Sequence, residues 1–496
     1  MTTWHEGNRT EFTKTVIKLL PTIILWFVGG LALSRILYEG FFPYLLWLGR
    51  PLYIIPFALI ISLLGTDVWQ RKQIQAAALL PLLLNLLYLF DPTVDLVASR
   101  LIFLASLWLV ALLIAHNSTD EAAWRWLGIF FVLAALLPVY LLTMPDAVGQ
   151  ADTFEFQVVA PQLGIAHPTG YPLYLLLGKL FTLLPINSVA WRLNVGTMVY
   201  GLTAVSLLFV LGCRMKMRGI TAVLGATLFG LIPTFWSQAI EAEVYTLHTL
   251  FVVLAFLLMR EIGGWAVDSE QWTVNSKQWL PIALALVLGL GMTNHLTTVF
   301  LLPAAALTLL FSSTFSRKKS SIQNLKSLIL LALAFLLPLL LYAYLPIRWQ
   351  VINHEPMGMA RFLDWVIGGR FAGALQWRAW LDDMTRYEVI GRIYLTNWGW
   401  FNLTLALFGF IFMLWRNWQM ALIFGITWLG YTFYGLNYYV PDLDVFIVGA
   451  QMVVAVWWMA GASGILKIED QRLKRHITPN LQSLIFNLLI IAFILP

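Results

Sequence analysis

Apolar segments about as long as a lipid bilayer is thick recur along nearly the whole chain, and they limit the folds available to it. A helix needs about 20 apolar residues to cross the ~30 Å hydrocarbon core of a membrane. Segments that approach this length are 16–38, 41–65, 74–90, 96–115, 124–144, 190–212, 219–237, 244–260, 279–293, 296–311, 325–346, 397–415, 418–436, 445–465 and 481–495. We therefore expect an all-α, polytopic integral membrane protein with about 14–15 transmembrane helices and long extracytoplasmic loops.

The composition excludes the main alternatives to a membrane protein. Hydrophobic residues make up 60% of the 496-residue chain and charged residues 11%, whereas a soluble domain carries roughly 25% charged residues. The single cysteine, Cys213, rules out an internal disulfide and a cysteine-rich metal site. The net charge of +6 does not indicate a nucleic-acid partner, because basic residues of membrane proteins collect on their cytoplasmic side.

The distribution of charge also predicts which loops face the cytoplasm. Basic clusters at 71–72, 214–218, 317–319 and 474–475 are expected on the cytoplasmic side, which puts the acidic loops outside. Two of these outer loops are long, at about 145–189 and 347–396, and the second holds six Arg and no Lys.

Residues 168–185 are apolar, yet we do not expect them to cross the membrane. A crossing here would put the basic cluster 214–218 outside, and the segment opens with Pro168, Gly170 and Pro172. A helix in the outer interface, or a re-entrant segment, fits the pattern better.

Two carboxylates, Asp152 and Glu155, begin the first long outer loop. Their i, i+3 spacing puts both on one face of a helix, where they can act as a general base and its orienting partner or bind a divalent cation. The same spacing also fits a capping box, with Asp152 as the N-cap and Glu155 at N3.

A proline- and glycine-rich segment follows, at 166–174, and it contains His167 and Tyr171. Irregular backbone at membrane depth survives only where it is buried in protein or lines a wet cavity. This segment therefore predicts a cavity; the alternative is a rigid turn with an interfacial tyrosine.

Four further polar groups fall on the same predicted outer side, each with a plain structural alternative. Glu243, which follows Glu241, is either a functional acid or part of a solvated acidic loop. Asn294 and His295, at the tip of a predicted helical hairpin, are either functional or structural residues. Arg348 either binds phosphate or carboxylate, or anchors the chain in the interface. Asp442 and Asp444 are either functional acids or part of a Pro-Asp turn. Their shared side suits a lipid phosphate substrate with a polar head.

The motifs at these places resemble, in order along the chain, the protein O-mannosyltransferase-like family of GT-C membrane glycosyltransferases, which has bacterial and animal members. The matching segments are 152–156, 163–174, 191–194, 243–245, 294–297, 344–348 and 440–446. More distantly, the layout looks like that of the transferases that decorate lipid A.

The resemblance implies an enzyme that takes a sugar from a polyprenyl-phosphate carrier at the extracytoplasmic face. An acidic residue of the first outer loop would act as the base, and that position matches Asp152, with Glu155 as the second acid. His167, Tyr171, His295 and Arg348 would contact the donor and its phosphate. Glu243, Asn294, Asp442 and Asp444 are further candidates.

The chain departs from the family pattern in two places. About five predicted spans precede the catalytic loop, so residues 1–123 are expected to form additional transmembrane helices before a GT-C-like domain at 124–465; residues 466–496 would form a cytoplasmic segment and a last span. Phe154 also stands where the family commonly has Gly.

We therefore expect an inverting glycosyltransferase in the plasma membrane, with its active site outside and mannose as one candidate sugar. The acceptor hydroxyl could belong to a protein, a lipid or a glycan, and a divalent cation is possible. The alternative is a transporter or flippase of lipid-linked sugars. No P-loop motif is present, so direct use of ATP is not expected.

Overall fold

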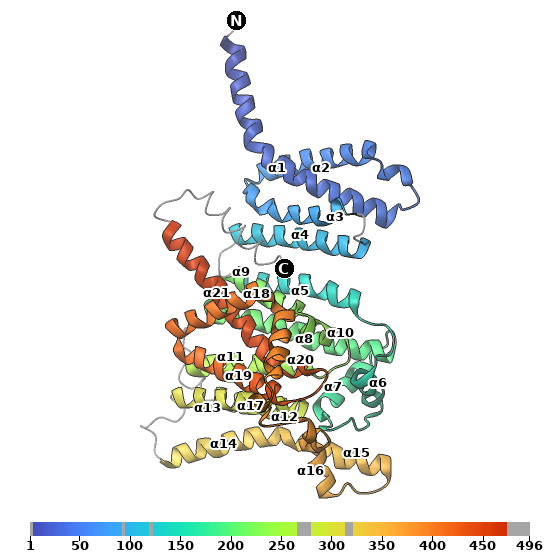
Figure 1. The fold of residues 1–496 in the computed structure, drawn as a ribbon, viewed down its shortest axis with the longest axis vertical. Coiled ribbons are helices and arrows are strands. Elements are labelled where there is room, and N and C mark those ends of the chain that lie inside the picture. Colours follow the sequence, from blue (N-terminus) through green and yellow to red (C-terminus); the bar gives the residue numbers. More distant parts are fainter. Residues whose placement is uncertain (1–2, 92–94, 119–122, 265–278, 313–320, 474–496) are drawn as a thin grey trace. The chain divides into compact units, whose positions relative to one another are not determined.

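The computed structural model describes residues 3–91, 95–118, 123–264, 279–312 and 321–473, and these form helices joined by short turns (Figure 1). Within these ranges no β-strand forms; Leu375 and Tyr438 make an isolated β-bridge. The predicted all-α fold is confirmed. The predicted last span, 481–495, and the basic clusters at 317–319 and 474–475 lie outside the described residues.

Backbone contacts divide the chain into two compact units, the first of residues up to Ala123 with the chain from Leu466 onward, and the second of Trp124–Ile465. The helices of the first unit are α1 (Thr3–Phe41), η1 (Leu46–Gly49), α2 (Pro51–Arg71), η2 (Ala76–Asn85), α3 (Leu86–Leu89) and α4 (Leu96–Ser118). In this unit α1 packs against α2, and η2 packs against α4.

The second unit contains all the candidate site residues. Its helices are α5 (Trp124–Thr143), α6 (Ala151–Gln162), α7 (Pro172–Thr182), α8 (Val189–Arg214), α9 (Gly219–Leu231), α10 (Pro233–Ile240), α11 (Tyr245–Gly263), α12 (Leu280–Asn294), η4 (Leu296–Leu301), α13 (Leu302–Phe311), α14 (Ser321–Leu339), η6 (Leu340–Ala343), α15 (Tyr344–Asn353), α16 (Met359–Ile367), η7 (Gly369–Ala374), α17 (Ala379–Asp382), α18 (Thr385–Arg416), α19 (Trp418–Asn437), α20 (Leu443–Phe446) and α21 (Val448–Leu473).

Nine helices in the described ranges are long and apolar enough to cross a membrane, which makes this a multi-pass membrane protein. The bent pair α9–α10, with an angle of 68°, can supply a tenth crossing. Three predicted spans, 74–90, 279–293 and 296–311, correspond to shorter apolar helices. Helix α7 has 11 residues, too few to span a bilayer core at 1.5 Å per residue.

Close helix packing builds the interior of the second unit. Almost all of the apolar part of α21 is buried, and it crosses α18 where two glycines face each other. A Cβ atom on Gly409 would lie only 1.7 Å from the carbonyl oxygen of Trp457, and one on Gly461 would lie 2.4 Å from that of Leu405. Small residues at such crossings let two backbones approach closely within a membrane.

Basic side chains bond the C-terminal end of α6, one of the short helices that carry the site. Lys179 bonds the carbonyl of Pro161 at the end of α6, and Arg348 bonds the carbonyls of Leu163 and Gln162 just beyond it. The last carbonyls of a helix have no partner within the helix, and its C-terminus attracts cations. These bonds therefore fix the end of α6 and the start of the turn that leads to His167.

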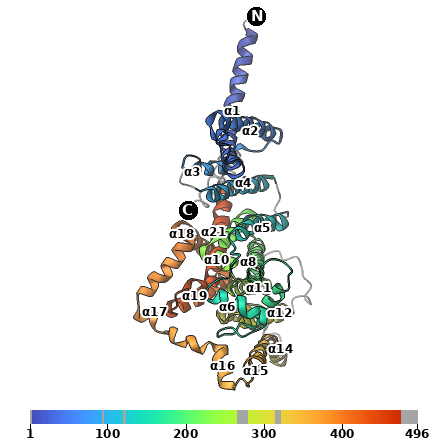
Figure 2. The ribbon, with the colours of Figure 1, turned by 90° about the vertical axis from the view of Figure 1, so that its right-hand side faces the viewer.

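Helices α15, α16 and α17 follow one another along one edge of the second unit (Figure 2). One face of α16 packs Phe362 and Val366 against a small cluster around Leu345. Its other face presents Met359, Leu363 and Ile367, each more than half exposed. Their i, i+4, i+8 spacing forms one apolar stripe. The helix ends at Gly368, whose φ of 69° favours glycine.

Candidate functional site

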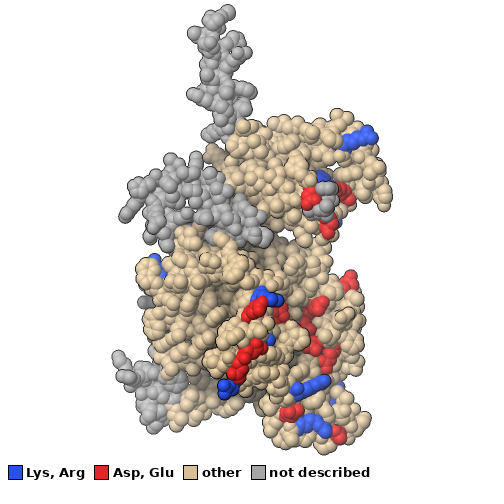
Figure 3. All heavy atoms as spheres, viewed as in Figure 1, with Lys and Arg blue, Asp and Glu red and all other residues tan. Residues whose placement is uncertain are grey.

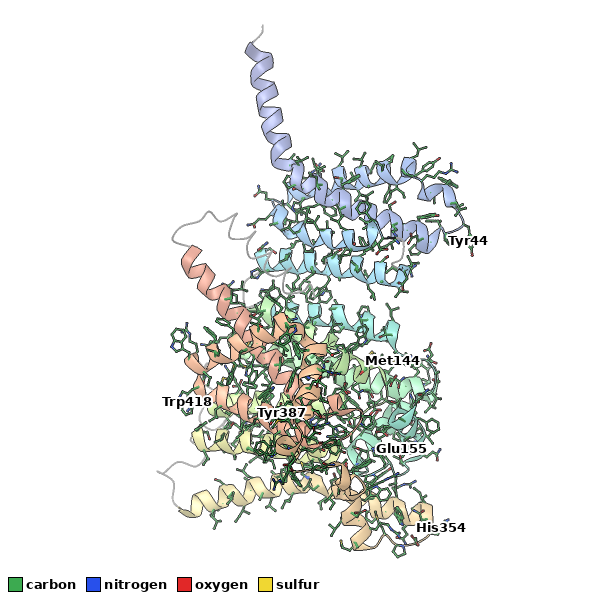
Figure 4. All side chains as sticks on the ribbon, viewed as in Figure 1. Tyr44, Met144, Glu155, His354, Tyr387 and Trp418 are labelled. Carbon is green, nitrogen blue, oxygen red and sulfur yellow. The ribbon has the colours of Figure 1, made fainter. Side chains whose placement is uncertain are left out.

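Helix α6 carries the predicted carboxylate pair, with Asp152 in its first turn and Glu155, labelled in Figure 4, three residues later. The N-cap of this helix is Gln150, and Asp152 lies two residues later, at position N2. The capping-box alternative is therefore not what the structure forms. Glu155 instead accepts a hydrogen bond of 2.9 Å from the backbone N–H of His167, and its other carboxylate oxygen bonds the ring Nδ1 of His167.

His167 joins the pair to the turn that follows α6. Its Nε2 lies 3.1 Å from the hydroxyl oxygen of Tyr171 and 3.7 Å from a carboxylate oxygen of Asp152. Burial lowers the pKa of His167, but the hydrogen bond to Glu155 and the charges of Asp152 and Glu155 raise it more, so the net shift is upward. Both ring nitrogens thus have partners, which favours a protonated imidazole beside Asp152.

A cavity of about 780 Å³ opens beside His167, and we name it the His167 cavity. Its lining includes Asp152, Glu155, His167, Thr169, Tyr171, Tyr245, His295, Arg370, Phe371, Tyr434, Tyr438, Asp442 and Phe446. These residues come from α6, the following turn, α11, the α12–η4 junction, η7 and the α19–α20 region. The cavity predicted from the proline- and glycine-rich segment is thus present.

A second hollow, of about 770 Å³, lies on the other side of Asp152, and we name it the Glu243 cleft. Gln150, Asp152, Thr153, Gln238, Glu241, Glu243, Tyr245, Pro441 and Asp442 are among its lining residues. In the part of the chain that the structure describes, neither Lys nor Arg lines it. Asp152, Tyr245 and Asp442 border both hollows. Figure 3 shows acidic side chains gathered over the part of the second unit where α6 lies.

Glu243 is the most deeply placed carboxyl of the cleft. The hydroxyl of Thr153, the residue after Asp152, donates a hydrogen bond of 2.9 Å to Glu243. Burial raises the pKa of Glu243 to about 8, with the negative charges of Asp152, Glu241 and Asp442 acting in the same direction and the Thr153 bond opposing them. Glu243 is therefore mostly protonated at neutral pH. Burial and the nearby charge of Asp152 also raise the pKa of Asp442, against the effect of a backbone hydrogen bond.

His295 lines the cavity as a buried neutral side chain. Burial lowers its pKa to about 3, and the charge of His167 lowers it further. Its Nδ1 lies 2.6 Å from the hydroxyl of Thr297, which in turn lies 3.2 Å from Nε2 of His248. A fixed network therefore holds the imidazole against the cavity, where it can offer a hydrogen bond but not a positive charge.

Three of the predicted residues lie outside both hollows. The guanidinium of Arg348 is bonded to the backbone at the end of α6, as described above. Asn294 is buried and donates to the carbonyl oxygen of Val244 at 3.1 Å. Asp444 accepts a hydrogen bond of 2.8 Å from the hydroxyl of Thr234. These contacts are structural, in contrast to those of Asp152, Glu155, His167 and Tyr171, which converge on one cavity.

Several residues of the hollows were not singled out from the sequence, above all Arg370 and the aromatic Phe371. The available signal for Arg370 was its place after Gly368 and Gly369 in a segment with arginines and no lysine. Tyr438, in contrast, begins the sequence group that includes Asp442 and Asp444, and it lines the His167 cavity.

One set of side chains in the described ranges offers ligand atoms for a metal ion. These are Asp152, Glu155 and His167, whose atoms lie within 4.8 Å of one another. One imidazole and two carboxylates are a suitable donor set for a divalent transition metal. Both ring nitrogens of His167 already have hydrogen-bond partners, however, so a metal ion would have to displace one of them.

Comparison with known proteins finds similarity over the part of the chain that carries these hollows. Residues 152–319 match the family model described as the protein O-mannosyl-transferase TMEM260 N-terminal domain. The chain is 34% identical over 222 residues to mouse protein O-mannosyl-transferase TMEM260, which is 44% of this chain and 30% of that protein. It is 29% identical over 184 residues to the Dictyostelium discoideum protein of the same name, covering 35% of this chain and 22% of that protein.

The matched region thus spans less than a third of the length of either relative. Among solved structures, the chain resembles the crystal structure of ArnT from Cupriavidus metallidurans bound to undecaprenyl phosphate. The TM-score is 0.47 with 12% identity, over 74% of this chain and 70% of that one. The expected resemblance is confirmed: residues 152–319 carry the sequence pattern of the O-mannosyltransferase-like TMEM260 family.

Proposed function

We propose that this protein is a GT-C-type glycosyltransferase that moves a sugar from a polyprenyl-phosphate carrier to an acceptor hydroxyl. The observation that carries the proposal is the position of Asp152 on the boundary between two hollows of different chemistry. A transferase needs a base that can reach both substrates, and a carboxylate at this boundary meets that requirement. The names of the relatives, protein O-mannosyl-transferases, support mannose as the sugar and a protein as the acceptor.

In this proposal the His167 cavity holds the donor. Its lining contains the cationic groups Arg370 and His167 and the aromatic rings of Tyr171, Tyr434 and Phe446. Cations stabilise the charge that develops on a departing phosphate, and aromatic rings supply apolar surface for the lipid side. The neutral His295 contributes a hydrogen bond to the bound donor.

The Glu243 cleft would hold the acceptor. Its carboxyls and the absence of Lys and Arg from its lining disfavour an anionic acceptor and suit a neutral hydroxyl. Asp152 would remove the proton from that hydroxyl while the hydroxyl oxygen attacks the anomeric carbon. The bond from that carbon to the phosphate oxygen breaks, the polyprenyl phosphate leaves with the electron pair, and the configuration at the anomeric carbon inverts.

Glu155 and His167 would act on this step through position and charge. Glu155 fixes the orientation of His167, whose Nε2 lies 3.7 Å from a carboxylate oxygen of Asp152. The residues Asp152, Glu155 and His167 can also hold a divalent cation, but the proposed step needs none. We place the protein in the plasma membrane with both hollows on the extracytoplasmic side, as the charge distribution predicts.

The test uses the purified full chain in detergent with a synthetic polyprenyl-phosphate mannose and peptides rich in Ser and Thr. We expect mannosylated peptide and free polyprenyl phosphate in equal amounts. The alternative class, a flippase of lipid-linked sugars, would leave the carrier intact. An intact carrier in the presence of a range of protein, glycan and lipid acceptors would therefore overturn the proposal.

A further inference from the structure

The segment 347–396, from within α15 to within α18, contains six arginines, all in described parts of the chain, and five of them have partners. Arg348 bonds the carbonyls of Leu163 and Gln162, Arg386 bonds those of Gly435, Leu436 and Tyr438, and Arg361, Arg378 and Arg392 pair with Glu355, Asp382 and Glu388. Among the described residues, Arg370 has neither a hydrogen-bond nor an ion-pair partner.

Arg370 is also the one Lys or Arg among the described residues that lines the His167 cavity. The backbone before it turns at Gly368, whose φ of 69° favours glycine. A larger residue at Gly368 would therefore strain the turn between α16 and η7, and this turn sets where Arg370 meets the cavity.

The other cationic group of the cavity, His167, has its ring nitrogens engaged by Glu155 and Tyr171. Arg370 is thus the lining residue whose charged N–H donors are free. It lines the same cavity as His167, and the ring of Phe371, the next residue, has its centroid 6.0 Å from that of the His167 ring. A guanidinium presents planar paired donors that match the oxygens of a phosphate.

We propose that Arg370 is the residue that binds the phosphate of the lipid donor, a role that the sequence pattern assigned to Arg348. The inference rests on the proposed function, because it places the polyprenyl-phosphate carrier in the His167 cavity. Three carboxyls, Asp152, Glu155 and Asp442, also face this cavity. Without Arg370, the phosphate would be repelled by these carboxyls. The one other cationic group of the described lining, His167, already has its ring nitrogens bonded.

The experiment measures binding to the full chain in detergent, with no sugar transfer involved. Polyprenyl phosphate and the uncharged polyprenol of the same length are titrated, and ligand-induced thermal stabilisation reports the affinity. We expect Arg370→Gln to weaken the binding of polyprenyl phosphate about 10- to 100-fold, because hydrogen bonds from a charged donor are lost. Binding of polyprenol should not change, and Arg370→Lys should restore part of the affinity.

Arg378→Gln is the matched control, because Arg378 lies in the same loop, is exposed, and borders neither hollow. It should bind both lipids like the unmodified chain. If Arg370→Gln keeps the preference for polyprenyl phosphate over polyprenol, the assignment of Arg370 is wrong while the donor site stands. If the unmodified chain shows no such preference, both the assignment and the donor site fall. If the unmodified chain prefers polyprenyl phosphate, Arg370→Gln loses that preference, and yet no sugar is transferred, the assignment of Arg370 stands and only the proposed reaction is overturned.

Discussion

At the scale of single residues, environment separates the carboxyls of the site into different roles. Asp152 is half exposed at the boundary of two hollows, whereas Glu243 is half-buried in the lining of one of them and its pKa is raised to about 8. One acid is thus available as a base, and the other is a neutral hydrogen-bonding group. Two acidic groups in one site take different roles when their surroundings move their pKa values apart.

The first prediction concerns Asp152. Asp152→Asn preserves the size of the side chain but removes the basic oxygen, so transfer should fall by about 10²–10⁴-fold. The measurement is turnover with polyprenyl-phosphate mannose, with the thermal midpoint recorded in parallel. Asp146→Asn, an exposed residue of the same loop outside both hollows, serves as the control. Near-normal turnover in Asp152→Asn, with the control also active, would make Asp152 a structural residue.

The second prediction concerns the stability that Glu243 contributes at different pH values. Its pKa of about 8 in the folded protein lies above the ordinary value of 4.5, so folding retains a proton that the unfolded chain releases. This contribution is fully present below about pH 4.5 and is lost as the pH rises through about 8. Thermal unfolding midpoints should therefore fall over that interval.

Glu243→Gln mimics the protonated form and should flatten that part of the pH profile. Glu388→Gln, on an exposed carboxylate paired with Arg392, should keep the profile of the unmodified chain. An identical pH dependence in Glu243→Gln would show that Glu243 is already ionised in the folded protein.

At the scale of elements, the structure assigns several cations to helix ends. Arg348 and Lys179 bond the end of α6, Arg192 bonds the carbonyls of Thr182 and Leu184 after α7, and Arg386 bonds those at the end of α19. Each positive charge meets the negative end of a helix dipole. These bonds add to the apolar packing of α6 and α7 in anchoring the short helices of the site.

The third prediction separates this anchoring from ligand binding. Arg348→Gln should destabilise the protein by about 1–3 kcal/mol, because carbonyls at the end of α6 lose a charged donor. Polyprenyl phosphate should still bind to the molecules that remain folded. The thermal midpoint and the affinity are measured on the same preparation, with Arg378→Gln as the control. Unchanged stability with lost affinity would return the phosphate role to Arg348.

At the scale of the whole molecule, the sequence predicts the fold class and the position of most helices because bilayer thickness imposes a length on apolar segments. It also predicts that Asp152, Glu155, His167 and Tyr171 belong together, since they lie within 20 residues of one another. It does not predict which arginine of the long loop is free. That depends on carbonyls and acids brought together by packing, such as Leu163 beside Arg348, 185 positions apart.

Two local patterns have a different outcome from the one the sequence predicts, each for its own reason. The spacing of Asp152 and Glu155 fits a capping box. Glu155 instead bonds His167, 12 residues further on, and the N-cap of α6 is Gln150, two residues before Asp152. Residues 74–90 are apolar enough for a span, yet they form a 3₁₀-helix with Pro81 inside it, followed by one turn of α-helix. A contact made across the fold decided the first, and local backbone chemistry decided the second.

The fourth prediction tests the topology on which the whole site depends. In a Cys213→Ala background, a cysteine in place of Asn353 should react with a membrane-impermeant reagent in intact cells. A cysteine in place of Ser316, beside the basic cluster, should react only after the cells are opened. The reverse pattern would put both hollows on the cytoplasmic side.

The apolar stripe of α16 makes the thickness of the surrounding membrane relevant to the reaction. Met359, Leu363 and Ile367 favour burial at the level where acyl chains meet head groups, and the chain reaches Arg370 three residues after the stripe ends. In a thicker or thinner bilayer the helix would follow the boundary, at a modest cost per ångström of mismatch.

We expect transfer in vesicles to peak at one acyl-chain length, and Leu363→Gln to blunt that optimum; identical rates at all lengths would contradict this. The lipids would then tune the enzyme by setting the depth of its phosphate-binding residue, as well as serving as its solvent.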